Sequence, residues 1–157
     1  PVDLLHKAVR SKIKDYDVVL IDCPPNLGLI TLNGLRISHG YIIPTIPDIL
    51  STYGIPQIIK RVRDFSEDVG EDIEPLGIVV TKYQEISTVH RNTWRALTKN
   101  ADTPVFDTII QQRNQYAQAA ENPEGPRTFK QKYGYGGLAE DFISLTREVL
   151  QKLEDVR

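Results

Sequence analysis

The sequence contains no methionine and only one cysteine, Cys23, among its 157 residues. A single cysteine cannot form an internal disulfide, so the disulfide-rich class of secreted domains is excluded. No apolar run approaches the roughly 20 residues that span a bilayer, and the first residues lack the regions of a secretory signal. We therefore expect a cytoplasmic protein without a membrane segment. The lack of methionine and the start at Pro1 also indicate a fragment of a longer protein.

The composition and net charge are those of an ordinary single domain. A net charge of -2 gives no global attraction to nucleic acid or anionic lipid, so such binding would need a local basic patch. The length and the average hydrophobic and charged fractions suit one domain over residues 1–157. The three histidines and one cysteine lack metal-ligand spacing, so we expect no structural zinc.

Four short apolar runs bounded by turn residues predict buried strands. Helical patterns lie between these runs, which predicts an α/β fold with a mainly parallel sheet flanked by helices. In such sheets, ligands bind just beyond the carboxyl ends of the strands. The predicted strands cover Val18–Ile21, Tyr41–Ile46, Leu76–Thr81 and Val105–Ile110.

Helical periodicity marks five segments of the chain, and the stripe of the last one is typical of core packing. The apolar positions of the third run from Ile55 to Phe65, which places Pro56 in the first turn, where proline is tolerated. The stretch Glu121–Gly137, rich in Gly, Pro and charge, predicts a long surface loop. The helical segments are Val2–Ile13, Leu29–Ile37, Ile55–Phe65, Ser87–Lys99 and Gly137–Leu153.

The first predicted strand ends in an acid, Asp22, followed by Cys23 and two prolines. An apolar strand ending in Asp has the form of a Walker B element, whose carboxylate supports the Mg²⁺ of a bound nucleotide. The same pattern also occurs in α/β proteins as a helix cap or turn residue, so both interpretations stay open on this pattern alone. We interpret Cys23 as a small strand-end residue, because nothing brings a histidine near it to lower its pKa.

The stretch "IDCPPNLGLITLNGL" at residues 21–35 resembles the switch segment of ParA-type partition ATPases, the deviant-Walker branch of the P-loop NTPases. Three later stretches are similar to the same family in the same order, so the resemblance covers nearly the whole chain. It implies a ParA/MinD-like P-loop fold. The stretches are "YIIPTIPDILSTYGIPQII" at 41–59, "LGIVVTKY" at 76–83 and "VFDTIIQQRNQYAQAA" at 105–120.

The resemblance implies roles for the positions that match the family's motifs, with ATP and Mg²⁺ as cofactors of the intact protein. Asp22 would hold Mg²⁺. The family usually has a proline before its Arg-Asn pair, where this chain has Gln111 and Gln112, which is a departure at the contact with the base. The γ-phosphate would be sensed by a turn at Cys23, Pro24 and Pro25. The residues near the base would be Thr81, Lys82, Arg113 and Asn114.

The largest departure from the family is the absence of its glycine-rich loop with two lysines and of its second Asp-bearing strand. That loop supplies the donors and charges that hold the phosphates, and electrostatic stabilisation is most of what a protein contributes to phosphoryl transfer. We therefore expect the carboxyl-terminal part of a ParA-like ATPase domain, which alone binds Mg-ATP poorly and is inactive as an ATP hydrolase.

Nonspecific DNA binding is the second activity that the resemblance implies. Arg91, Arg95 and Lys99 are spaced by four and form one basic stripe on the predicted helix. A solvated helix face is the alternative interpretation of the same stripe. In ParA-type proteins the DNA surface is made of scattered basic residues and is completed by the ATP-bound dimer. The further candidates here are Arg113, Arg127, Lys130 and Lys132.

The implied function is plasmid or chromosome partitioning by a nucleoid-associated homodimer that a centromere-binding, ParB-like partner releases from DNA. Two alternatives remain. A MinD-like division-site ATPase should end in a basic amphipathic helix, whereas the last helix here has a core-like stripe and the tail "QKLEDVR" is of mixed charge. A non-catalytic interaction module could keep the fold without the phosphate loop.

Overall fold

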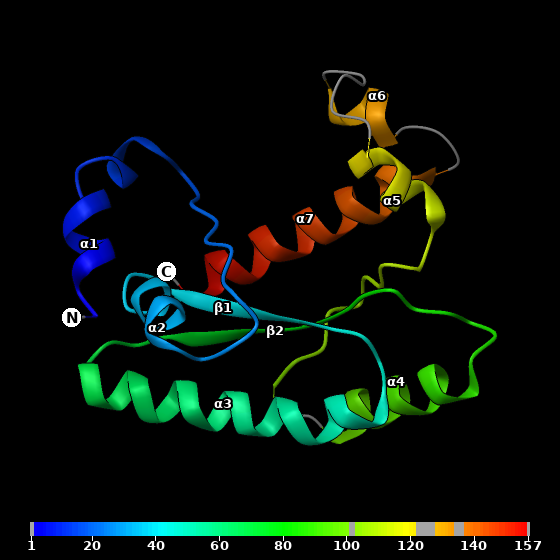
Figure 1. The fold of residues 1–157 in the computed structure, drawn as a ribbon, viewed down its shortest axis with the longest axis horizontal. Coiled ribbons are helices and arrows are strands. Elements are labelled where there is room, and N and C mark those ends of the chain that lie inside the picture. The colour runs from blue at the N-terminus through cyan, green and yellow to red at the C-terminus, as the bar shows by residue number, and fades with distance from the viewer. Residues whose placement is uncertain (1, 101–102, 122–127, 134–136, 157) are drawn as a thin grey trace.

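A parallel sheet with helices on both of its faces forms the centre of the molecule (Figure 1). The structure is a computed structural model that describes residues 2–100, 103–121, 128–133 and 137–156. Strand β1 (Gly40–Thr45) pairs in parallel with β2 (Glu74–Val80), with Ile43 opposite Ile78. The predicted α/β class and two of the predicted strands are thereby confirmed to within two residues.

A third row of backbone continues the sheet on the other edge of β2. Val105 bridges Ile78 in parallel, and Gln111 bridges Tyr83 further along. The amide of Ile110 donates to the carbonyl of Val80 at 2.9 Å. The predicted strand at Val105–Ile110 therefore lies where a parallel strand should lie, but only its two ends are paired.

The middle of this row leaves the sheet because a carboxylate takes its amides. The N–H groups of Asp107 and Thr108 donate to Glu148 Oε1 and Oε2 at 2.8 and 3.1 Å. Backbone donors must find partners somewhere, and here a side chain replaces the neighbouring strand. The prediction of one continuous strand was therefore wrong at these residues.

The segment predicted as the first strand, Val18–Ile21, does not form a strand. Residues 17–24 run without regular structure, and the side chain of Leu20 is 83% exposed. A strand exists only where a neighbour completes its hydrogen-bond ladder, and no described strand lies against this segment. Apolar content alone was therefore a poor guide to pairing here.

Helices α3 (Ile49–Val69) and α4 (Thr88–Asn100) cover one face of the sheet (Figure 1). A core cluster joins the two helices to both strands, and the predicted helix at Ser87–Lys99 is confirmed as α4. The members of the cluster are Ile43, Ile55, Ile78 and Leu97.

Helix α3 begins about two turns earlier than the sequence pattern predicts. The Asp48 carboxylate accepts a hydrogen bond from the N–H of Ser51 at 2.8 Å and caps the helix at its first residue, Ile49. Pro56 therefore lies in the helix interior rather than in the first turn. There it leaves the carbonyl of Thr52 without its intrahelical donor.

Helix α7 (Leu138–Asp155) covers the opposite face, and its predicted apolar stripe packs on the sheet. Leu145, Val149 and Leu153 lie against a core cluster made by Leu76, Val79 and Phe106. The prediction that the last helix uses its stripe for core packing is confirmed.

Two shorter helices lie before β1. Helix α1 (Leu4–Val9) ends before the predicted limit at Ile13, and a single 3-10 turn follows at Ile13–Asp15. Helix α2 (Leu29–Leu35) begins after Gly28 and matches the predicted helix at Leu29–Ile37.

The predicted surface loop at Glu121–Gly137 contains a short helix, α6 (Phe129–Tyr133), which follows α5 (Asn114–Glu121). The backbone of Thr128 donates to Gln131 Oε1, and the backbone of Gln131 donates to Thr128 Oγ1, both at 3.2 Å. This reciprocal pair is a capping box, which the loop prediction overlooked. Residues 122–127 and 134–136 lie outside the described part of the chain.

The central position of β2 gives a test of the fold. Ile78 is fully buried, so Ile78→Ala should lower the free energy of unfolding by about 2–5 kcal/mol through lost burial and a cavity. Ile86→Ala is the matched control, because Ile86 is 90% exposed and should change stability by less than about 0.5 kcal/mol. Urea unfolding measures both, and equal effects would contradict the placement of β2.

Candidate functional site

The residues after Asp22 form a tight turn that is closed by local hydrogen bonds. We call Pro24–Gly28 the switch turn. The amide of Asn26 donates to the Pro24 carbonyl at 2.7 Å, and the amide of Gly28 donates to Asn26 Oδ1 at 3.0 Å. The turn leads directly into α2, so its shape sets the start of that helix.

Asp22 is exposed at the entrance to the switch turn and has neither a hydrogen bond nor an ion pair with another described residue. Within the described residues, no three His, Cys, Asp or Glu side chains form a group that could hold a metal by protein ligands alone. Mg²⁺ is usually held by one or two carboxylates together with substrate phosphates. The exposed carboxylate of Asp22 fits that mode of binding.

Cys23, beside Asp22, is exposed and lies in a segment without regular structure, so the prediction of a strand-end position was wrong. Partial burial of its thiol, and then the neighbouring Asp22 carboxylate, raise the pKa of Cys23 above its ordinary value. A raised pKa keeps the thiol protonated at neutral pH, and only the thiolate is a good nucleophile. The interpretation of Cys23 as non-nucleophilic therefore agrees with its surroundings.

The carboxyl ends of β1 and β2 meet at Thr81, whose polar groups are both used. Its amide and its hydroxyl donate to the carbonyl of Thr45 at 2.8 and 3.1 Å. The next residue, Lys82, is exposed and has a φ of 50°, a left-handed conformation that is uncommon outside glycine. The backbone thus turns sharply at the end of β2 and leaves the Lys82 ammonium without an ion pair among the described residues.

A polar network that the sequence pattern did not predict surrounds the end of β1. The hydroxyl of Thr45 donates to Ser51 Oγ at 2.9 Å, and the Ser51 hydroxyl lies 2.9 Å from Asp48 Oδ1. The backbone N–H of Ser51, and then its hydroxyl, hold the pKa of Asp48 below its ordinary value. Asp48 is the N-cap of α3 and Ser51 is the third residue of the helix. This spacing is the sequence signal that could have revealed the network.

Arg113 is held by α7 rather than pointing freely from the loop. Its guanidinium lies 3.8 Å from Asp141 Oδ2, and the Tyr116 hydroxyl donates to the same oxygen at 3.1 Å. Burial, and then the bond to Asp141, raise the pKa of Tyr116 to about 12. Arg113 Nε is buried and finds no acceptor among the described residues. Asn114 is exposed and begins α5.

Hydrogen bonds join the two segments that carry the predicted contacts with the nucleotide base. The Gln112 amide donates to the carbonyl of Tyr83 at 2.9 Å, and the Gln84 and Gln112 side chains are hydrogen-bonded. This brings the segment after Lys82 beside the segment before Arg113. Among the described residues, no hydrogen bond or ion pair joins the Asp22 region to Lys82 or Arg113, so their roles at one nucleotide stay predictions.

The basic stripe on α4 is less uniform than its spacing suggests. Arg91 is engaged locally, because its guanidinium donates to the Glu85 carbonyl at 2.5 Å and to Thr88 Oγ1 at 3.2 Å. Arg95 and Lys99 are exposed, and no described acid pairs with either of them. The two free cations are therefore the stronger candidates for phosphate contacts.

The remaining basic candidates are less informative. The Lys132 ammonium lies 5.9 Å from the centre of the Tyr133 ring, a cation–π distance. Arg127 and the side chain of Lys130 lie outside the described part of the structure.

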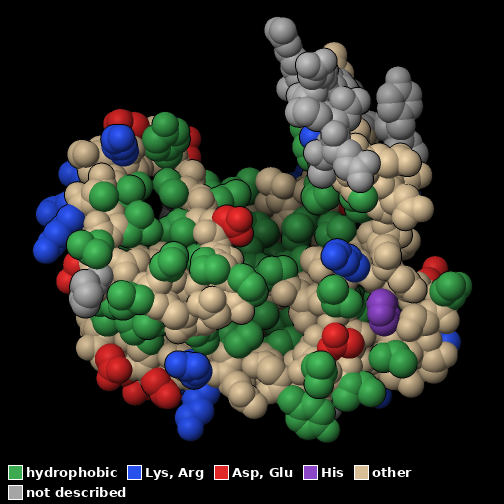
Figure 2. Space-filling view, in the orientation of Figure 1, with side chains coloured by type: hydrophobic (Ala, Val, Ile, Leu, Met, Phe, Trp, Pro, Cys, Tyr) green, Lys and Arg blue, Asp and Glu red, His purple; other side chains and the backbone are tan. Residues whose placement is uncertain are grey.

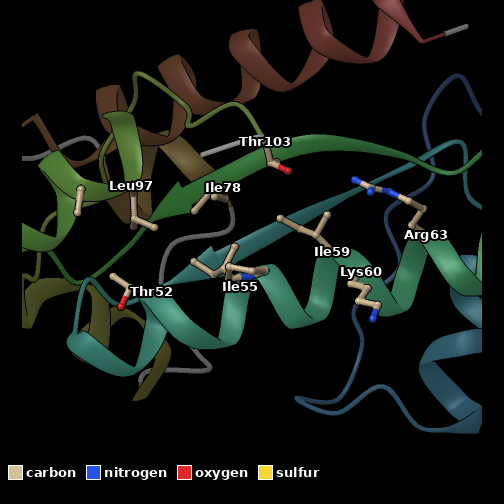
Figure 3. A pocket seen from close by; sticks show the side chains of 10 residues that line it. Thr52, Ile55, Ile59, Lys60, Arg63, Ile78, Leu97 and Thr103 are labelled. Atoms are coloured by element: carbon tan, nitrogen blue, oxygen red, sulfur yellow. The ribbon is translucent and has the colours of Figure 1, made fainter. Parts of the chain in front are cut away.

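A cavity of about 410 Å³ lies between α3 and α4, beneath Ile78 and Leu97 (Figure 3). Ile55 and Ile59 face it from α3. The rest of the lining is polar in part, because it includes Thr52, Thr103 and the exposed cations Lys60 and Arg63. None of the lining residues belongs to the switch turn, so the cavity is separate from the candidate nucleotide site.

Comparison with known proteins gives a consistent set of relatives. A family model described as an AAA domain matches residues 2–75. The chain is 28% identical over 149 residues to the cell division protein PomZ of Myxococcus xanthus, covering 95% of this chain and 46% of PomZ. It is 30% identical over 109 residues to the chromosome-partitioning ATPase Soj of Treponema pallidum, covering 69% of this chain and 43% of Soj.

A solved structure agrees with these relatives. The cobyrinic acid a,c-diamide synthase of Mycobacterium smegmatis, solved with bound ADP and magnesium, superposes with a TM-score of 0.63 at 29% identity. The match covers 75% of this chain and 52% of that enzyme. The chain thus spans about half the length of the proteins that it matches.

The Asp48 network predicts a measurable pH dependence. Because its pKa is depressed, Asp48 stabilises the start of α3 above its unfolded pKa, near 3.9, and this contribution is lost as pH falls through the folded pKa. Ser51→Ala removes one of the two bonds and should raise the Asp48 pKa, as followed by NMR titration of its carboxyl carbon. Ser38→Ala is the control, because the Ser38 hydroxyl bonds to the Gly34 carbonyl. An unchanged Asp48 pKa in Ser51→Ala would contradict the network.

Proposed function

We propose that this chain, as part of a ParA-type P-loop ATPase, serves ATP-dependent partitioning of DNA. The relatives named Soj and PomZ support the proposal and agree with the resemblance of the sequence to that family. One observation carries the proposal: Asp22 is exposed and unpaired at the entrance to a turn that α2 holds in shape. An acid that the fold leaves without a hydrogen bond or ion pair is available to a metal ion.

In the proposed site, Asp22 holds Mg²⁺, which when bound offsets the negative charge of the nucleotide phosphates. The backbone of Cys23 and of the first two residues of the switch turn, Pro24 and Pro25, follows the γ-phosphate. Lys82 supplies a cation near the nucleotide base. The phosphates also require a glycine-rich, lysine-bearing loop, which these 157 residues do not contain.

The proposed ATP-dependent dimer is supported by exposed apolar side chains at the carboxyl ends of the strands. Leu50 at the start of α3 is 78% exposed, and Ile49 and Ile86 are exposed as well. Figure 2 shows one broad face of the molecule, where further hydrophobic side chains gather around a hollow near the middle of the view. Apolar patches of this kind commonly mark protein interfaces, and a second copy of the chain is the proposed occupant.

The proposed DNA contact uses Arg95 and Lys99, with Arg91 and Arg113 as weaker contributors because other groups already engage them. Such contacts would be made to phosphates, so binding should depend strongly on salt and little on sequence. A centromere-binding, ParB-like protein would stimulate release, and the protein would be found on the nucleoid.

The structure favours this proposal over a MinD-like membrane role. The apolar stripe of α7 is used against Leu76, Val79 and Phe106, so it is not available for a membrane surface. In the described part of the chain, none of the helices is long and apolar enough to span a bilayer. A non-catalytic interaction module remains the second candidate, and nucleotide binding separates the two.

The first functional prediction concerns Asp22. In the intact protein, Asp22→Asn should weaken Mg-ATP binding by about 10–100-fold, because the metal ion loses a charged ligand, while metal-free ATP binding stays similar. Asp64→Asn, an exposed acid on α3, is the control. Calorimetric titration measures both, and unchanged affinity in Asp22→Asn would refute the metal role. The 157-residue chain alone should bind Mg-ATP poorly.

The second functional prediction concerns DNA. In the intact protein with ATP, replacing both Arg95 and Lys99 by Glu should weaken binding to random-sequence duplex and lower the salt slope by about one for each phosphate that the variant no longer binds. Arg61→Glu, on the exposed side of α3, should have a smaller effect. Fluorescence anisotropy at several salt concentrations measures this, and equal losses in both variants would contradict the assignment to α4.

A further inference from the structure

Helix α2 buries polar side chains where a core helix would ordinarily place apolar ones. Thr31 is 7% exposed and Asn33 is 8% exposed, and both lie in a helix of seven residues. Burying a hydroxyl or an amide without a partner is costly, so the partners of these groups indicate what the helix holds.

Thr31 holds the switch turn. Its hydroxyl donates to the Asn26 carbonyl at 2.6 Å and lies 3.5 Å from the Pro24 carbonyl. Both carbonyls belong to the turn, but the hydroxyl has one proton, so Thr31 fixes the Asn26 peptide group and only contacts that of Pro24. Without this hydroxyl, the Asn26 carbonyl would lose its hydrogen bond from α2.

Gly34, on the same side of α2 as Thr31, brings the helix against the residues beside Asp22. A Cβ at position 34 would lie 3.2 Å from Cys23 Sγ and 3.2 Å from Ile21 Cγ2, closer than most side-chain contacts. The missing side chain is therefore what permits this approach. Helix α2 thus touches the segment on both sides of Asp22.

Asn33 projects from a different side of α2 and holds α1. Its Oδ1 accepts from the amides of Leu4 and Leu5 at 3.1 and 3.3 Å, which satisfies the free start of that helix. Arg36, at the end of α2, pairs with Asp3 at 3.4 Å and reinforces the same contact. Helix α2 is therefore bonded to the switch turn on one side and to α1 on another.

We propose that α2 is a coupling helix: Thr31 positions the switch turn, Asn33 positions α1, and a change in either is transmitted to the other. Thr31 is a positioning residue in this scheme, because it acts on nucleotide only through the turn. The scheme rests on the proposed function in one respect, namely that the switch turn senses the γ-phosphate. The coupling itself is a property of this chain without nucleotide.

NMR-detected amide exchange on the 157-residue chain, with no ATP present, tests the coupling. Thr31→Val should speed exchange of the Asn26 and Gly28 amides by about fivefold, the effect of losing one ordinary hydrogen bond. It should also speed exchange of the Leu4 and Leu5 amides by about twofold or more, as coupled residues do. Thr31→Ser, which keeps the hydroxyl, should restore both.

Thr98→Val is the matched control, because the Thr98 hydroxyl bonds only to the carbonyls of Trp94 and Arg95 in its own helix. It should leave the turn and α1 unchanged. The reverse experiment is Asn33→Ala, which should speed exchange in the switch turn.

The outcomes are distinct. An unchanged switch turn in Thr31→Val would refute the positioning role, and a changed turn with unchanged α1 amides would refute the coupling. Equal acceleration that also includes the β2 amide of Ile78 would refute it too, because Thr31 would then stabilise the fold as a whole. Mg-ATP titration of the intact protein tests the proposed function separately, so the failure of one does not imply the failure of the other.

Discussion

The structure depends on β2 being paired along both edges and covered on both faces. Its Ile78 side chain faces the α3 and α4 cluster, whereas Val79, the next residue, faces the α7 cluster. Gly77 allows the segment at Pro104 to approach the second edge of β2, because a Cβ at position 77 would lie 2.7 Å from the Pro104 carbonyl oxygen. Its φ of 147° is also a conformation that favours glycine. One strand with alternating side chains and a closely approached glycine thus joins two layers of helices.

This arrangement limits which polar groups near the strand ends can bind a ligand, because several of them already bond to one another. Thr81 and Thr45 satisfy each other at the ends of β2 and β1, and Asp141 neutralises Arg113 from α7. Asp22 and Lys82 are different, since neither has a hydrogen bond or ion pair with a described residue. Both side chains are exposed, so water can satisfy their charges until a ligand replaces it.

The sequence predicts those parts of the fold that one element's own pattern determines. Three features could be predicted because each pattern lies within one short segment. They are the apolar run at β2, the apolar stripe of α7 and the motif of the switch segment. The missing strand at Val18–Ile21 could not be predicted from its own residues, since a strand depends on a neighbouring strand. The position of Pro56 within α3 was predicted wrongly because the cap at Asp48 starts the helix earlier. The bond from Leu4 to Asn33 joins residues 29 apart, which no local period reveals.

The contacts of α2 cannot be predicted from the hydrophobic pattern of the helix alone. A helix built only for packing would place apolar residues at positions 31 and 33, where any aliphatic side chain of suitable size serves. Thr31 and Asn33 instead bond to segments on two different sides, and each bond has a defined direction and length. Directional bonds fix the relative positions of the switch turn, α2 and α1 more tightly than apolar packing does, and the proposed coupling requires that rigidity.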